Sequence, residues 1–144
     1  MERKKIWSVM LVLLAALSFA SCESSRSVGD WDSMVWKAEV PVVQTTDGIY
    51  DVSDDGGTFT FSCRNYSRPW IEQAASGDRY FLPDRESGDF HTITADWFRA
   101  EVVGNKLTVS FEPNKKPMEQ SLSLTVTAGD IFYTFKFKQS KQSH

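Results

Sequence analysis

The stretch Thr58–Cys63, TFTFSC, alternates without a break between polar and apolar side chains. Successive side chains of a β-strand point to opposite faces, so Phe59, Phe61 and Cys63 would share one face and the hydroxyl residues the other. Such alternation is typical of an antiparallel sheet that has a core on one side and water on the other. The stretch therefore predicts a strand that buries its aromatic face.

The same pattern predicts further strands that share this core. Three are regular: KLTVSF at 106–111, SLSLTVT at 121–127 and IFYTFKFK at 131–138. Others are predicted at 98–103 and, with less regular alternation, at 35–43, 48–52 and 91–94. No helical 3.6-residue period persists beyond Trp31. Seven or eight short antiparallel strands predict an all-β, immunoglobulin-like β-sandwich.

Turn residues separate the strands, and one segment interrupts their rhythm. Gly104-Asn105 suits a tight hairpin between two of the strands, because both residues tolerate a positive φ. Residues 72–90, EQAASGDRYFLPDRESGDF, instead carry scattered charges, two Gly and one Pro. We expect either a functional loop or an irregular insertion here, with a short strand at 80–82 inside it.

The first twenty-two residues predict export and a lipid anchor. Basic MERKK at 1–5 precedes an uncharged run at 6–20, which is short for a membrane-spanning helix and typical of a signal peptide. Phe19-Ala20-Ser21-Cys22 resembles the lipobox of bacterial lipoproteins, with Phe19 where Leu is usual. That resemblance implies cleavage before Cys22 and a diacylglycerol on its thiol.

Four segments follow from this reading. We expect a signal peptide at 1–21, the lipidated Cys22 with a polar tether at 22–30, the β-sandwich at 31–140 and a short tail at 141–144. If Cys22 carries lipid, Cys63 has no intramolecular partner, because the chain has two cysteines. The fold must then depend on its apolar core without a disulfide.

Charge argues against a nucleic-acid partner. The whole chain carries a net charge of −3, and removal of residues 1–21 leaves 13 basic and 18 acidic side chains. Phosphate contacts need clustered Lys and Arg, and Lys115-Lys116 is the one adjacent basic pair beyond Lys5. We expect no nucleic-acid binding.

Three further pieces of sequence point to a known module. They are Asp54-Asp55-Gly56-Gly57 before an alternating strand, Asn65 followed by Trp70-Ile71, and Asn114 before a strand, a turn and a last strand that ends in Gln139. With these pieces, residues 51–139 resemble the BACON domain, a carbohydrate-associated module of gut-bacterial envelope proteins. Gln120 stands where that family usually has Arg. The resemblance implies a β-sandwich and an envelope role, either in carbohydrate binding or as a spacer.

Residues for catalysis or metal binding are few. His91 and the terminal His144 are the two histidines, and no Gly-x-Ser-x-Gly turn is present. Cys63 lies on the inward face and should behave as a small hydrophobe. The carboxylates Asp84, Glu86 and Asp89 suit turns, with a calcium site as the alternative. We expect no catalytic residues, no metal and no cofactor.

Aromatic side chains are the best hint of a ligand. They make up 13% of the chain, and sugars stack on exposed Trp and Tyr rings. Most Phe residues fall on inward faces, and Trp70 matches a core position of the resemblance. The candidate ligand-binding aromatics are Tyr80, Phe81, Phe90 and Trp97. Separately, Asp32-Ser33-Met34 resembles an O-glycosylation motif of gut bacteria, which makes Ser33 a candidate for modification.

The sequence thus predicts a non-catalytic lipoprotein held in the bacterial outer membrane through Cys22, on its periplasmic or cell-surface face. Its expected role is glycan binding or display. The alternatives are a structural or spacer subunit that contacts other envelope proteins and, less favoured, a small hydrolase. Exposure of Tyr80, Phe81 or Trp97 on one patch would favour binding, whereas burial of every large aromatic ring would argue against it.

Overall fold

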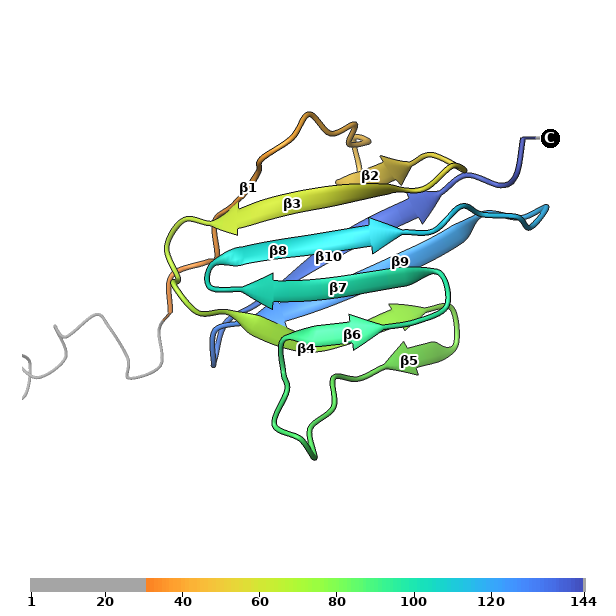
Figure 1. Ribbon diagram of the computed structural model, residues 1–144. Helices are drawn as coiled ribbons and strands as arrows, with labels where there is room; N and C mark the ends of the chain where they lie inside the picture. The colour runs from red at the N-terminus through yellow and green to blue at the C-terminus, as the bar shows by residue number, and fades with distance from the viewer. Residues whose placement is uncertain (1–30, 144) are drawn as a thin grey trace, which may run out of the picture. The chain divides into compact units, whose positions relative to one another are not determined.

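Ten β-strands in two facing sheets make up residues 32–143 (Figure 1). The structure is a computed structural model that describes residues 31–143, so the predicted signal peptide, Cys22 and the tether lie outside the described residues. The architecture confirms the predicted all-β, immunoglobulin-like sandwich. The described residues contain no helix long and apolar enough to cross a membrane.

Each sheet has five strands. The first has the order β1 (Trp36–Ala38), β3 (Gly57–Cys63), β8 (Lys106–Phe111), β7 (Phe98–Val103) and β6 (Thr92–Thr94), with every neighbouring pair antiparallel. The second has the order β2 (Ile49–Val52), β10 (Phe132–Gln139), β9 (Gln120–Thr127), β4 (Trp70–Ser76) and β5 (Arg79–Phe81). Here β2 runs parallel to β10, and the other pairs are antiparallel.

The core forms where the predicted apolar faces of the two sheets meet. Phe61 and Leu107 of the first sheet and Leu124 and Phe135 of the second are fully buried, as the alternation predicted. The rings of Phe61 and Phe135 lie 4.7 Å apart, in a tilted arrangement that joins the sheets. Cys63 is also buried and unpaired, in agreement with its predicted role as a core residue.

The register of the strands gives the sandwich two distinct ends. At the near end the chain enters at residue 32, and the turns at 64–69, 104–105 and 128–131 lie there. The far end carries the β2–β3 turn, the β4–β5 turn, the segment 95–97 and the long β8–β9 loop at 112–119. Figure 1 shows the beginning of the described residues and these far-end loops at opposite ends of the sheets.

Two expectations about local structure were wrong. Residues 72–90 are not one irregular loop, because 72–76 continue β4 and pair with β5 in a hairpin. A register shift between Ile71 and Gln73 moves one residue out of phase and hides the alternation in the sequence. The two strands of this hairpin, β4 and β5, bring the strand number to ten, above the predicted seven or eight.

The predicted strand at 35–43 is the second error. Only Trp36–Ala38 pairs with β3, and the chain beyond Glu39 leaves the sheet. Pro41 lacks an N–H to donate, so it cannot extend an antiparallel ladder. The segment returns as an isolated bridge between Gln44 and Tyr50.

A buried amide at the far end joins three parts of the chain. Gln139 is fully buried, and its Nε2 donates to the carbonyl oxygens of Ser53 at 3.1 Å and Glu112 at 2.8 Å. Its Oε1 accepts a hydrogen bond from Gln120 at 3.1 Å. The side chain therefore satisfies two loop carbonyls that strand pairing cannot reach.

Asn114 is a second buried amide at this end, in the β8–β9 loop. Its Nδ2 donates to the carbonyls of Met118 at 2.9 Å and Ser140 at 3.0 Å, and its Oδ1 accepts from the backbone N–H of Lys116 at 3.0 Å. The backbone N–H of Gln142 donates to the Lys116 carbonyl at 2.9 Å. The predicted tail is thus fastened to the sandwich at 140–143.

Replacement of Gln139 by Leu should destabilise the fold strongly, since it keeps the volume but removes the donor to the Glu112 carbonyl and the acceptor of the Gln120 amide. The Ser53 carbonyl keeps the N–H of Gly56 as a donor. Each buried polar group left unpaired costs about 1–3 kcal/mol, so we expect a loss of about 2–5 kcal/mol in the free energy of unfolding. Urea unfolding measures it. The matched control is Gln73→Leu on the outer face of β4, and an equal loss in both variants would contradict this role.

Gly56 should tolerate no side chain. Its φ is +86°, and a Cβ there would lie 2.2 Å from the carbonyl oxygen of Phe111. Gly77 has a φ of +58° with nothing within 4 Å, so Gly77→Ala tests the backbone cost alone. We expect Gly56→Ala to lose about 2 kcal/mol more than Gly77→Ala in urea unfolding. Equal losses would show that the loop moves aside without cost.

Candidate functional site

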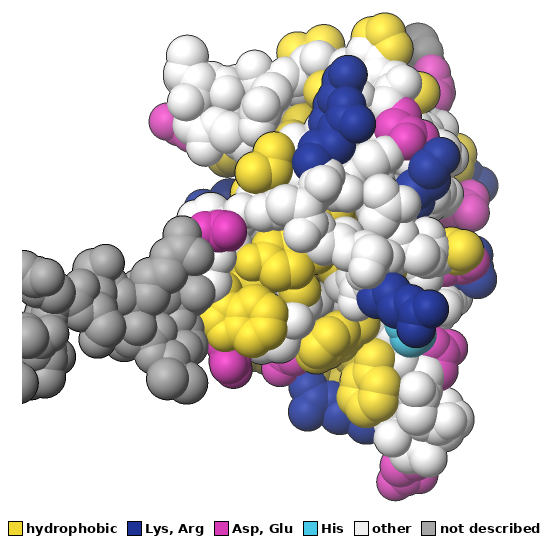
Figure 2. All heavy atoms as spheres, turned by 90° about the vertical axis from the view of Figure 1, so that its left-hand side faces the viewer, with side chains coloured by type: hydrophobic (Ala, Val, Ile, Leu, Met, Phe, Trp, Pro, Cys, Tyr) yellow, Lys and Arg dark blue, Asp and Glu magenta, His cyan; other side chains and the backbone are white. Residues whose placement is uncertain are grey.

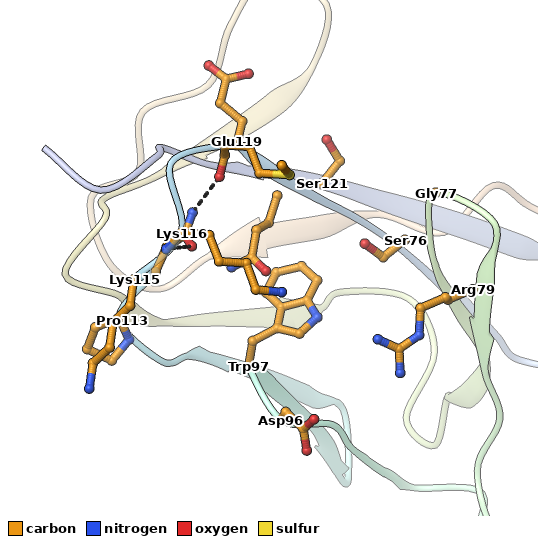
Figure 3. Close-up of a pocket in the computed structure, with 13 residues that line it drawn as sticks. Ser76, Gly77, Arg79, Asp96, Trp97, Pro113, Lys115, Lys116, Glu119 and Ser121 are labelled. Atoms are coloured by element: carbon orange, nitrogen blue, oxygen red, sulfur yellow. Dashed lines mark hydrogen bonds between the residues drawn. The ribbon is translucent and has the colours of Figure 1, made fainter.

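An open groove of about 640 Å³ lies at the far end of the sandwich (Figure 3). Three segments that are distant in sequence line it: the β4–β5 turn with Arg79, the segment 95–97 with Asp96 and Trp97, and residues 113–121. A second hollow, of about 660 Å³, adjoins it and shares Asp96, Pro113 and Lys115 with the groove. The site is therefore built by one turn from each sheet and by the β8–β9 loop, which joins the two sheets.

Trp97 provides the flat apolar surface of the groove. Its half-buried ring packs against Phe98, with centroids 5.1 Å apart, and against Phe111 at 6.0 Å. Both Phe rings are buried in the core, so the indole has a firm support behind it. Figure 3 shows the indole in the middle of the lining residues. The arrangement presents an aromatic face to a bound molecule at little cost in side-chain entropy.

Arg79 stands beside this surface and is held by an aromatic contact. Its guanidinium carbon lies 5.3 Å from the centroid of the Phe81 ring. Phe81 in turn meets Phe98 edge-on at 5.1 Å, and Phe98 supports Trp97. A chain of ring contacts thus connects the cation of β5 to the indole on the opposite sheet.

The buried amide of Gln139 is connected to the groove through the backbone of Glu112. Glu112 accepts the Gln139 hydrogen bond through its carbonyl, and its backbone N–H donates to the Trp97 carbonyl at 2.9 Å. The Trp97 backbone is therefore connected through Glu112 to Gln139, the buried amide that holds the far-end loops. Position and support of the indole both derive from the fold rather than from a flexible loop.

The four predicted aromatics do not form one patch. Trp97 lines the groove, whereas Phe81 lies behind it as part of its support. Tyr80 is 69% exposed, and strand alternation places it on the face of β5 opposite Arg79 and Phe81. Phe90 lies toward the near end, where its carbonyl accepts a hydrogen bond from the N–H of Ile71. Of the four, Trp97 is the one that lines the far-end groove.

Phe90 belongs to a separate, shallow apolar hollow of about 440 Å³. Trp70 and His91 complete its lining. Nδ1 of His91 lies 3.9 Å from Oδ1 of Asp89, and both side chains are half exposed. Figure 2, which faces the near end, shows hydrophobic side chains gathered there. This face contrasts with the polar rim of the far-end groove.

The loop carboxylates serve turns. Asp84 accepts from the backbone N–H of Ser87 at 3.3 Å, and hydrogen bonding from Ser87 lowers the pKa of the Asp84 carboxyl. Asp89 accepts from the N–H of His91 at 2.9 Å. Within residues 31–143, no three His, Cys, Asp or Glu side chains are placed to hold one metal ion.

Ser33 is exposed on the stretch before β1. Its carbonyl accepts a hydrogen bond from Nδ2 of Asn65 at 2.8 Å, and Oδ1 of Asn65 accepts from the N–H of Val35 at 2.9 Å. The hydroxyl of Tyr66 donates to the carbonyl of Asp32 nearby. The candidate modification site therefore lies on a fixed backbone, and Asn65 is a structural residue.

Sequence reasoning missed Arg79, Asp96 and Lys116, which the structure brings around Trp97. Each lies in a turn or loop where a charged residue is unremarkable, and no local spacing connects the three. Their proximity follows from the pairing of β4 with β5 and the crossing between the sheets, which a single sequence does not display.

Comparison with known proteins supports the fold. No protein-family model matches the chain, and no curated protein matches it. An NMR structure of a protein from Bacteroides thetaiotaomicron is similar, with a TM-score of 0.68 and 27% identity over 85% of this chain and 99% of that one. The twitchin kinase region from C. elegans matches 78% of this chain and 18% of its own, with 11% identity and a TM-score of 0.46. Titin domain M7 matches 79% of this chain and all of its own, with 13% identity and a TM-score of 0.43. The fold is an immunoglobulin-like β-sandwich.

Proposed function

We propose that this protein is a non-catalytic lipoprotein of the bacterial outer membrane that binds glycans through the far-end groove. The observation that carries the proposal is the Trp97 ring, which is partly exposed in an open groove and supported from behind by Phe98 and Phe111. The resemblance of residues 51–139 to the carbohydrate-associated BACON domain points in the same direction.

The chemistry of the groove suits a saccharide. The apolar face of a sugar ring stacks on an indole, and its hydroxyls need hydrogen-bonding groups around that face. Arg79, Asp96 and Lys116 line the same groove and offer donors and an acceptor. An apolar platform with a polar rim is the combination that a sugar requires.

The position of the groove suits display. The chain enters the sandwich at the near end, and the groove lies at the far end. If Cys22 carries lipid, the tether of residues 23–30 joins the membrane to the near end, with a reach of about 28 Å. The groove would then lie at the opposite end of the sandwich from the tether's attachment, where polymers in the surrounding space can reach it.

A second candidate function is that of a structural subunit. Val103 and Phe132 at the near end are 67% and 55% exposed, and Trp70 lies in register with Phe132 across β9. Figure 2 shows hydrophobic side chains on this end. Such a surface can pack against another envelope protein.

Replacement of Trp97 by Ala should abolish the stacking surface. We expect glycan affinity to fall at least tenfold, about 1.4 kcal/mol, with Trp97→Phe keeping part of it. A glycan array with the purified full-length protein identifies the ligand, and titration calorimetry measures the variants. Urea unfolding shows whether each variant is folded.

Trp70→Ala is the matched control, because it removes a half-buried tryptophan near the other end. It should leave glycan affinity unchanged. Equal losses in the two variants, or an array with no bound glycan, would argue for the structural function instead.

Replacement of Cys22 by Ser should release the protein from membranes. The thiol is the predicted site of the lipid, and without an acyl chain the protein loses its strong anchor. Cell fractionation and metabolic labelling with a fatty-acid analogue measure both effects. Cys63→Ser, which alters the buried thiol, is the control, and labelling that persists in Cys22→Ser would contradict the anchor.

A further inference from the structure

Two cations in the groove lie on either side of the Trp97 indole. Arg79 extends from the start of β5, and Lys116 reaches across from the β8–β9 loop. Figure 3 shows both side chains directed toward the indole, whereas Lys115 points away from it. A molecule stacked on Trp97 would therefore meet a positive group on each side.

Neither cation forms an ion pair with a carboxylate of the described residues. The ion pairs among residues 31–143 join other groups, and none of them contains Arg79 or Lys116. The acidic lining residue Glu119 is already engaged, because its carboxylate lies 3.6 Å from Nζ of Lys138. In Figure 3 that carboxylate points away from the indole. Asp96 is then the single carboxylate left in the groove.

The Arg79 cation is positioned by a ring contact, and the Lys116 side chain extends from a fixed backbone. The Arg79 guanidinium rests over the Phe81 ring at 5.3 Å. The backbone of Lys116 is held from both sides, since its N–H donates to Asn114 at 3.0 Å and its carbonyl accepts from Gln142 at 2.9 Å. Pre-positioned charges lose less entropy when a ligand binds.

The charge of the groove is opposite in sign to the net charge of the whole chain. The chain has a net charge of −3, yet the groove is lined by three basic and two acidic side chains, one of them paired elsewhere. Neutral sugars need no unpaired cations, whereas a carboxylate or a sulfate is recognised by Arg and Lys.

From this geometry we infer that the ligand of the groove is an acidic saccharide, one whose ring stacks on Trp97 while its carboxylate or sulfate lies between Arg79 and Lys116. Asp96 accepts hydrogen bonds from the sugar hydroxyls. This inference rests on the proposed glycan binding and adds the charge class of the ligand.

The test compares polymers that differ only in charge, using the full-length protein in detergent. One pair is polygalacturonate and its methyl ester, which distinguishes a carboxylate, and the other is dextran sulfate and dextran, which distinguishes a sulfate. Calorimetry should show at least tenfold tighter binding of one or both acidic polymers. That binding should weaken at least fivefold between about 0.05 M and 0.5 M salt, because screening reduces charge attraction.

Variants of the two cations test whether the preference for the acidic polymer arises in the groove. Arg79→Gln and Lys116→Gln should each lower the affinity for the acidic polymer about fivefold, and by more than they lower any binding of its neutral counterpart. Lys136→Gln is the matched control, since it removes an exposed charge from the outer face of β10. A loss in the control equal to that in the groove variants would overturn the inference.

The remaining outcomes separate the inference from the proposed function. Equal, salt-insensitive binding of acidic and neutral polymers would overturn the acidic ligand and leave glycan binding intact. No binding of any polysaccharide, here or on the array, would overturn both. A single-stranded DNA oligonucleotide that binds as tightly as the acidic polymers would replace saccharide recognition with general polyanion binding.

Discussion

The far end of this sandwich depends on the buried amide of Gln139. Strand pairing satisfies the backbone of β10 and β9, but the carbonyls of Ser53 and Glu112 lie beyond the ladders. The Gln139 side chain donates to both, and the N–H of Gly56 is a second donor to Ser53. A buried carbonyl without a partner is costly, so these loops have one favourable arrangement. The N–H of Glu112 donates a hydrogen bond to the Trp97 carbonyl. The position of Trp97 in the groove is therefore fixed by the hydrogen bonds of the buried core.

The aromatic core and the groove form one continuous packing system. Phe135 and Phe137 of β10 meet Phe61 and Phe111 of the other sheet, and Phe111 supports Trp97 at the surface. A sandwich without a disulfide needs such contacts for its stability, and the free thiol of Cys63 lies buried within the core. The same rings that hold the sheets together therefore hold the candidate binding surface rigid.

The sequence predicts the strands well where burial alternates, and poorly where one residue breaks the phase. Phe61, Leu107 and Phe135 could be assigned to the core because polar neighbours mark their faces. The shift after Ile71 concealed β4, and Pro41 shortened the first strand. The residues that carry the family resemblance, Gly56, Asn65, Asn114 and Gln139, have structural positions in turns and buried hydrogen bonds. These residues therefore support the predicted fold more than they support a ligand.

The candidate site shows a different limit. Trp97 could be predicted as a binding residue from its residue type. Arg79 and Lys116 become candidates only because the arrangement of the strands in the two sheets brings them close to Trp97. Contacts of this kind depend on register and on loop paths, which composition and periodicity leave open. A single sequence thus identifies the platform of the groove and not the charges around it.

The most direct test of the groove is an NMR titration of the protein with an acidic oligosaccharide, observed at the tryptophan indole N–H groups. If the groove binds the ligand, we expect the Trp97 indole signal and the backbone signals of residues 113–121 to shift together. The indole signals of Trp36 and Trp70 should not shift. Shifts confined to Trp70, Phe90 and His91 would place the binding surface in the apolar hollow that these residues line. That result would contradict binding in the far-end groove.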